Sequence, residues 1–299
     1  MIKNFEQLLK EATKSSGKKI AVAAAADADV LSAVENARKQ GIAGAILIGD
    51  EPEIKRIAEA NNIDTTNYEI IHSVDNAESS LIAARQVAEG NASVMMKGLV
   101  DTSVFLKAVL DKEIGLRTGK LITQVTVFEI PGRDQFILIS DPAITLAPDV
   151  AQKKDIIENA CVVAHKLGYE IPMVAPVCAV EKLNPKMQAT LDAQELHEMN
   201  VRGELVNCYV SGPISLDVAI STEAAAHKGY TDKIGGAANI LLMDDIESGN
   251  VLYKSVVYFA GGIGAGVVMG AKCPIILTSR ADSDVSKFYS IATAVLISD

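Results

Sequence analysis

Residues 19–48 read KIAVAAAADADVLSAVENARKQGIAGAILI, and this segment decides the fold. The apolar run at 20–25 predicts a buried strand, and the amphipathic spacing over 29–40 predicts a helix. Gly41 fits the end of that helix, and a second apolar run follows at 45–48. A strand, a helix and a second strand in this order predict two parallel strands joined by a right-handed crossover.

The same alternation continues along the rest of the chain. Two extended runs, 122–130 and 135–140, predict a hairpin around Pro131-Gly132-Arg133-Asp134. Further strands are predicted at 68–72, 93–97, 173–177, 206–210, 240–243 and 274–277, and further helices at 51–61, 81–89, 103–110, 149–167, 184–199, 216–226, 247–258 and 284–296.

The length of 299 residues indicates two domains, because one domain holds on the order of 150 residues. Asp141-Pro142 and Ala147-Pro148 interrupt the alternation, so we expect a boundary near Ser140. The last helix is expected to pack back on the first domain. The sequence therefore predicts an α/β protein with parallel-sheet layers, an interdomain cleft, and domains 1–140 with 278–299, and 141–277.

Composition and charge argue against several classes of protein. The net charge of −10 argues against nucleic-acid binding, which needs clustered Lys and Arg. No apolar run reaches the roughly 18 residues of a membrane helix and no leader pattern occurs, so we expect a cytoplasmic protein without a membrane partner. The four cysteines and four histidines lack the spacing of metal sites, so no metal is expected.

A glycine-rich stretch, Gly261-Gly262-Ile263-Gly264-Ala265-Gly266, does not match the G-x-G-x-x-G fingerprint. It follows a predicted helix rather than a strand, whereas the fingerprint follows a strand. We therefore predict a flexible turn there.

Polar side chains follow several predicted strands at the point where each strand ends. The carboxyl ends of parallel strands are where open α/β sheets bind ligands, so these loops together indicate a site. Two of these loops also have a structural alternative, namely a turn lysine with an N-capping hydroxyl at 97–103, and a capping or ion-paired Asp217. The candidates are Lys97, Gly98 and Thr102 in the loop at 95–103, Ser211 and Asp217 in the loop at 211–217, and Asn250 in the loop at 244–250.

The stretch 274–283, PIILTSRADS, carries the strongest local signal. A strand followed by a helix leaves free N–H groups and a positive dipole end at the helix start. Ser279, Arg280 and Ser283 therefore predict a site for a phosphate-bearing ligand. A plain strand-to-helix connection with an N-cap is the alternative.

These motifs together resemble the phosphate acetyltransferase and butyryltransferase family. Four of them match in order and spacing: GPISLDVA at 212–219, GGAANI at 235–240, GNVLYK at 249–254 and Ser279-Arg280. Three others resemble the butyryltransferase branch: MKGLVDT at 96–102, TLDA at 190–193 and LTSRADS at 277–283. The resemblance spans nearly the full chain.

The resemblance implies a two-domain architecture like that of isocitrate and isopropylmalate dehydrogenases. It implies reversible transfer of a butyryl group from butyryl-CoA to inorganic phosphate, giving butyryl phosphate and CoA. Coenzyme A is then a substrate rather than a permanently bound cofactor, and a homodimer or larger homo-oligomer is expected. The alternatives are acetyl-CoA as the substrate, a non-catalytic acyl-CoA binder, and a dehydrogenase, for which no metal and nicotinamide sites are evident.

The resemblance also assigns roles to residues. Ser279 and Arg280 are implied to be catalytic, binding coenzyme A and stabilising the transition state. Lys107 stands where the acetyltransferases have a phosphate-binding arginine, which keeps the charge but loses the two-pronged geometry. Ser286 stands where those enzymes carry an aspartate, so a general base is left open between Asp282, Asp284 and none.

Overall fold

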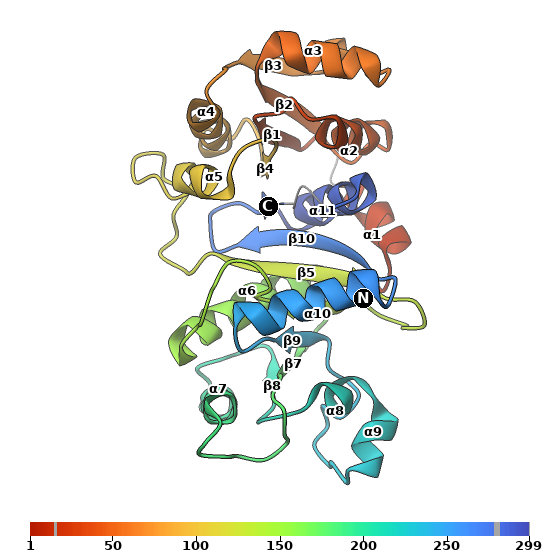
Figure 1. Cartoon of the computed structure of the whole chain (residues 1–299), viewed down its shortest axis with the longest axis vertical. Coiled ribbons are helices and arrows are strands. Elements are labelled where there is room, and N and C mark those ends of the chain that lie inside the picture. The colour runs from red at the N-terminus through yellow and green to blue at the C-terminus, as the bar shows by residue number, and fades with distance from the viewer. Residues whose placement is uncertain (15–16, 278–281, 299) are drawn as a thin grey trace. The chain divides into compact units, whose positions relative to one another are not determined.

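The computed structural model describes residues 1–14, 17–277 and 282–298. They form two compact units: unit 1 comprises residues 1–4 and 121–264, and unit 2 comprises 5–120 and 265–299. Helices and strands alternate through both (Figure 1), so the predicted α/β class is confirmed. The chain passes between the units at 4/5, 120/121 and 264/265. The domain boundaries predicted from the sequence, 140/141 and 277/278, stay a prediction.

Unit 2 is built on a mostly parallel sheet. Its strand order is β3-β2-β1-β4-β11-β10, and the first five of these strands are parallel, whereas β10 runs antiparallel to β11. The strands are β1 (Lys19–Ala23), β2 (Gly44–Gly49), β3 (Glu69–His72), β4 (Val94–Lys97), β10 (Ile263–Met269) and β11 (Ile275–Ile276).

The helices of unit 2 cover both faces of this sheet. Helix α11 contacts both α1 and α2 on one side, and α4 and α5 contact each other on the other side (Figure 1). Asp27 caps α2 by accepting from the backbone N–H of Val30, which explains why the helix begins there. The helices are α1 (Phe5–Ala12), α2 (Ala28–Lys39), α3 (Glu51–Ala60), α4 (Asn76–Ala88), α5 (Thr102–Val109) and α11 (Asp284–Ile297), with a short 3-10 turn η1 (Thr65–Asn67).

Unit 1 starts with the predicted hairpin, which is confirmed: β5 (Thr123–Glu129) pairs antiparallel with β6 (Ile137–Ser140). Strand β6 in turn pairs in parallel with β9. The hairpin therefore belongs to unit 1, and not to unit 2, which holds residues 5–120. The order is β5-β6-β9-β7-β8, and the last four strands are parallel. The remaining strands are β7 (Met173–Pro176), β8 (Tyr209–Val210) and β9 (Ile240–Leu242).

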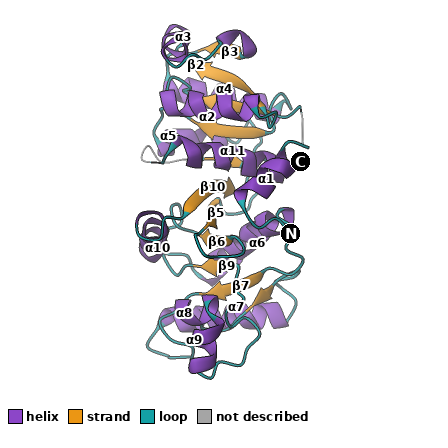
Figure 2. Cartoon of the chain, turned by 90° about the vertical axis from the view of Figure 1, so that its right-hand side faces the viewer, coloured by secondary structure: helices purple, strands orange, loops and turns teal. Residues whose placement is uncertain are grey.

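The helices of unit 1 flank its strands (Figure 2). One buried cluster joins Ile139 and Leu241 of the sheet to Val218, Ala225 and Val256 of three helices. Its members are fully or almost fully buried apolar side chains, so this face carries the core of the unit. The helices are α6 (Val150–Lys166), α7 (Gln188–Val201), α8 (Leu216–Ile220), α9 (Thr222–His227) and α10 (Ile246–Tyr258).

Two local predictions were wrong. The predicted turn at 261–266 contains only a short turn, because strand β10 begins at Ile263 and buries Gly264 and Ala265. A Cβ on Gly264 would lie 2.8 Å from the ring of Phe128, so glycine here permits close packing rather than flexibility. The helix predicted at 216–226 is split, because Ser221 is extended and caps α9 by accepting from the Ala224 N–H.

Glu35 is a charged side chain almost fully buried within unit 2. It accepts two hydrogen bonds from Arg38, at 2.8 and 2.9 Å, and one from the Tyr68 hydroxyl at 2.5 Å. The hydrogen bonds from Arg38 hold the pKa of Glu35 at about 2, although burial alone would raise it. The pair links α2 to Tyr68 next to β3. Glu53 and Arg56 make the same i,i+3 pair on the exposed surface of α3.

We expect Glu35→Gln to lower the free energy of unfolding by about 3 kcal/mol at neutral pH, because the folded-state pKa lies below the unfolded value. A depressed pKa stabilises the protein above the unfolded pKa, and that stabilisation is lost as the pH falls from about 4.5 to about 2. Urea unfolding at several pH values measures the effect. Glu53→Gln is the matched control, and an equal loss in both variants would contradict the prediction.

Candidate functional site

The carboxyl edge of the unit 2 sheet holds the first set of candidate residues. The strand order reverses direction between β1 and β4, and such a switch point opens a crevice for ligands in parallel sheets. The loop after β4 is fixed there by the backbone, because the N–H groups of Gly98 and Leu99 donate to the carbonyls of Ala23 and Ala24, both at 2.8 Å. The structure therefore brings Lys97 and Gly98 to the switch point.

Lys97 is buried, and its ammonium donates to the carbonyls of Gly98 at 3.2 Å and Val100 at 3.1 Å. These contacts make it an anchor of the loop that follows β4. Gly98 is required by the close approach of two backbones, since a Cβ there would lie 2.2 Å from the Ala24 oxygen and 2.7 Å from the Ala23 oxygen. The loop lies against the end of β1 because this residue has no side chain.

Thr102 and Lys107 lie on α5, which starts four residues after Gly98. Thr102 is exposed at the first position of the helix, where backbone N–H groups lack helical partners. Lys107 is exposed in the last turn, about 8 Å further along the helix axis. Thr102 is therefore close in the chain to the switch point, whereas Lys107 lies more than one turn away, and phosphate binding by Lys107 stays a prediction.

The start of α11 carries the last candidates of unit 2. Ser283 caps the helix, because its hydroxyl oxygen accepts from the Ser286 N–H at 3.2 Å. Asp284 accepts from the Val285 N–H at 2.8 Å, and the backbone oxygen of Asp282 accepts from the buried Lys287. The proposed catalytic residues Ser279 and Arg280 lie outside the described residues.

In unit 1, Ser211 and Asp217 have protein partners that the sequence left open. Ser211 is fully buried at the end of β8, and its hydroxyl donates to the Gly212 carbonyl at 2.9 Å. Asp217 forms an ion pair with Lys228 at 3.0 Å and accepts from the Ser215 hydroxyl at 2.5 Å. The hydrogen bond from Ser215, followed by that from Lys228, lowers the pKa of Asp217 to about 2. Asp217 therefore makes the ion pair that was predicted as its structural alternative, and substrate binding by either residue stays a prediction.

Asn250 connects α10 to the loop after β6. Its side-chain amide donates to the Pro142 carbonyl at 3.3 Å, next to Asp141. Asp141 is buried and accepts from the N–H groups of Ala143 at 2.9 Å and Ile144 at 3.1 Å. Burial raises the pKa of Asp141, while these N–H groups oppose the rise. The sequence placed Asn250 in a strand-end loop, whereas the structure places it within α10, from where it contacts the loop at the carboxyl end of β6.

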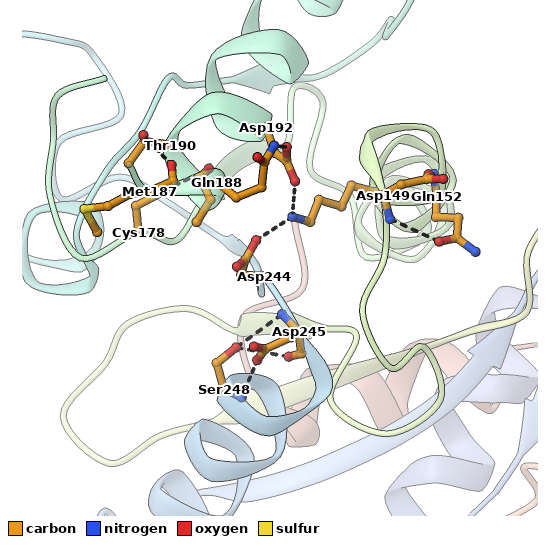
Figure 3. A network of polar contacts seen from close by, with 12 residues as sticks. Asp149, Gln152, Cys178, Met187, Gln188, Thr190, Asp192, Asp244, Asp245 and Ser248 are labelled. Atoms are coloured by element: carbon orange, nitrogen blue, oxygen red, sulfur yellow. Dashed lines mark hydrogen bonds and ion pairs between the residues drawn. The ribbon is translucent and has the colours of Figure 1, made fainter. Parts of the chain in front are cut away.

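Sequence reasoning missed a buried ion cluster at the same edge. Lys153 of α6 donates to Asp192 of α7 at 2.6 Å and to Asp244 after β9. Figure 3 shows the carboxyl groups of Asp192 and Asp244 with dashed lines to the same nitrogen. The sequence signal was weak, because Lys153 sits at an ordinary position of an amphipathic helix, although Asp244 does follow a predicted strand.

Other features of the described residues bear on chemistry. Cys161, Cys178, Cys208 and Cys273 are all free thiols. Residues 1–14, 17–277 and 282–298 include no group of three or more His, Cys, Asp and Glu side chains suited to a metal ion. Among the helices described, none has the length and apolar character needed to cross a membrane.

Comparison with known proteins connects these loops to one family. Residues 4–80 and 73–295 match phosphate acetyl/butaryl transferase. The chain belongs to the phosphate acetyl/butaryl transferase family. The resemblance inferred from the motifs is thereby confirmed.

Individual relatives cover the chain almost completely. The chain is 46% identical to phosphate butyryltransferase of Clostridium acetobutylicum over 99% of both chains. It is 42% identical to phosphate acetyltransferase of Thermotoga maritima over 98% of this chain and 99% of that one. The crystal structure of a branched-chain phosphotransacylase from Enterococcus faecalis matches with a TM-score of 0.83 and 33% identity, over 94% of this chain and 98% of that chain.

We expect Gly98→Ala to lower the free energy of unfolding by about 2 kcal/mol or more, because the new Cβ would overlap backbone oxygens that cannot rotate away. Thermal unfolding followed by circular dichroism measures the loss. Gly44→Ala is the control, since its Cβ would meet only the Lys19 side chain at an ordinary 3.7 Å. Equal stability of the two variants would show that the close approach at Gly98 is not required.

Proposed function

We propose that this protein transfers a butyryl group reversibly between coenzyme A and inorganic phosphate. Butyryl-CoA and phosphate give butyryl phosphate and CoA. Coenzyme A enters and leaves as a substrate in each turnover. The observation that carries the proposal is the 46% identity to a phosphate butyryltransferase over 99% of both chains, together with membership of the family.

The reaction needs no covalent enzyme intermediate. A phosphate oxygen forms a bond to the thioester carbonyl carbon, and the carbonyl becomes a tetrahedral oxyanion. When the oxyanion collapses, the carbon–sulfur bond breaks and CoA leaves as thiolate, which takes the proton that phosphate carried. Because phosphate is already a competent nucleophile, the protein's tasks are to align two reactants and to stabilise the developing charge.

Ser279 and Arg280 are proposed as the catalytic residues. A guanidinium stays protonated and can bind two oxygens at once, so Arg280 is suited to the phosphate or to the oxyanion. Ser279 would donate a hydrogen bond to the sulfur or to the oxyanion. Asp282 and Asp284 are both open as candidates for a general base, and a mechanism without a base is also open.

The substrate-binding proposal rests on the strand-end loops. Lys97, Gly98 and Thr102 are supported by their place at the switch point of unit 2, with the free N–H groups of α5 beside them. Ser283 is supported by its place as the N-cap of α11, at another helix start. The other proposed substrate-binding residues are Lys107, Ser211, Asp217 and Asn250.

One of the two alternatives has specific support. A relative at 42% identity is named a phosphate acetyltransferase, which favours acetyl-CoA as a second candidate substrate. A pocket distinguishes acyl chains weakly, since one methylene is worth only about 1–3 kcal/mol, so overlapping activities are expected. A non-catalytic acyl-CoA binder is the other alternative, and the Ser279-Arg280 pair argues against it.

We expect the purified protein to release coenzyme A from butyryl-CoA when phosphate is present, because phosphate is the attacking group. A thiol reagent measures the release, with butyryl-CoA and acetyl-CoA compared at equal concentration. Release without added phosphate is the control. Faster release from acetyl-CoA would move the protein to the acetyl branch, and binding without release would support the binder.

We expect Arg280→Lys to lower kcat on the order of a hundredfold while the protein stays folded, because lysine keeps the charge but loses the planar fork. Initial rates and circular dichroism measure the two properties. Arg56→Lys, on the exposed surface of α3, is the control. Wild-type turnover in Arg280→Lys would remove Arg280 from the catalytic assignment.

We also propose a homodimer or larger homo-oligomer. Helix α10 and the residue after it expose Val251 at 65%, Tyr258 at 71% and Phe259 at 88%, and exposed apolar side chains of this size are typical of protein contacts. Light scattering should give a multiple of 31.6 kDa, and the mass of one chain would contradict the proposal.

A cytoplasmic location is proposed too, supported by the four free cysteines.

A further inference from the structure

Lys153 forms a charged contact that joins three segments of unit 1. Its side chain is 4% exposed and comes from α6. One partner, Asp192 of α7, is 9% exposed, and its other carboxylate oxygen accepts from Gln188 at 2.7 Å. The second partner, Asp244, is 38% exposed and lies two residues after the end of β9. The two carboxylates therefore have different surroundings although they share one ammonium.

A buried ammonium is costly unless its charge is compensated. Burial alone would lower the pKa of Lys153, but the hydrogen bonds to Asp192 and Asp244 outweigh burial and raise it. The lysine is therefore charged at neutral pH, and both carboxylates are held to it. Such a contact fixes the segments that carry its members more strictly than apolar packing does.

The contact to Asp244 continues through the loop after β9 into α10, the helix that carries Asn250. Asp245, the next residue, caps α10 by accepting from the Ser248 N–H at 2.8 Å. A Cβ on Gly249 would lie 2.7 Å from the Asp141 oxygen, so the first turn of α10 lies directly on the loop after β6. Asn250 donates to Pro142 in that loop. Each step from Lys153 to Asn250 is thus a direct contact or a neighbour in the chain.

We propose that Lys153 is a positioning residue, which acts through Asp244 to hold the β9–α10 loop and Asn250 in the geometry that binds the coenzyme A substrate. This inference rests on the proposed acyl transfer. The loop lies at the carboxyl end of β9, the middle strand of the five in unit 1, where parallel sheets bind ligands. Asp192 instead ties Lys153 to α7 and contributes to stability.

Two substitutions separate positioning from a merely structural role. Asp192→Ala removes the more buried carboxylate and leaves Gln188 without its partner, so it should lower the melting temperature more than Asp244→Ala does. Asp244→Ala frees the loop and should weaken coenzyme A binding by about tenfold. Calorimetric titration with coenzyme A, the KM for butyryl-CoA and thermal unfolding are measured for both. Asp192→Asn replaces Asp192→Ala if the latter does not fold.

The proposal predicts opposite orders: the larger loss of stability in the Asp192 variant, and the larger loss of coenzyme A affinity in the Asp244 variant. If affinity falls in proportion to stability, or if neither variant changes affinity, Lys153 is only structural and the proposal is overturned. Wild-type protein that binds coenzyme A without phosphate-dependent release would contradict the proposed acyl transfer but would still allow the affinity test. Wild-type protein that does not bind coenzyme A would overturn both.

Discussion

The parallel pairing of β1 with β4 is the constraint on which the candidate site of unit 2 depends. It places Ala23 beside Lys97, and the ladder continues past the strands through the N–H groups of Gly98 and Leu99. Two loops from opposite sides of a switch point are thereby held at backbone contact distance, which only glycine permits at position 98. The free N–H groups at the start of α5 follow within a few residues, and such groups bind anions.

The loops at the carboxyl edge of the unit 1 sheet are held in place differently. Charged side chains make the contacts: Asp141 accepts from backbone N–H groups, Asp217 pairs with Lys228, and Lys153 donates to two carboxylates. The contacts of Lys153 join partners that lie far apart in the chain, 39 residues between Lys153 and Asp192 and 91 between Lys153 and Asp244. A buried charge without its partner is unfavourable, so each contact specifies one arrangement of the loops.

Much of the fold could be predicted from the sequence, because strands and helices of this class differ in the period of their apolar residues. The β5–β6 hairpin and the helices at 28–39 and 150–166 are examples. Strand β10 was missed because its glycines resemble a turn locally, and only packing against Phe128 makes them part of a strand. The cluster around Lys153 was missed because sequence spacing cannot show which distant charges meet. The roles of Ser279 and Arg280 come from family motifs.

The central claim is that phosphate attacks the thioester directly, with no acyl group passing to the protein. Isotope exchange tests it: butyryl-CoA, labelled free coenzyme A and protein are mixed with and without phosphate, and label entering butyryl-CoA is measured. Direct attack predicts exchange only when phosphate is present, since the label enters through butyryl phosphate. Equally fast exchange in the absence of phosphate would require an acyl-enzyme intermediate and would contradict the account.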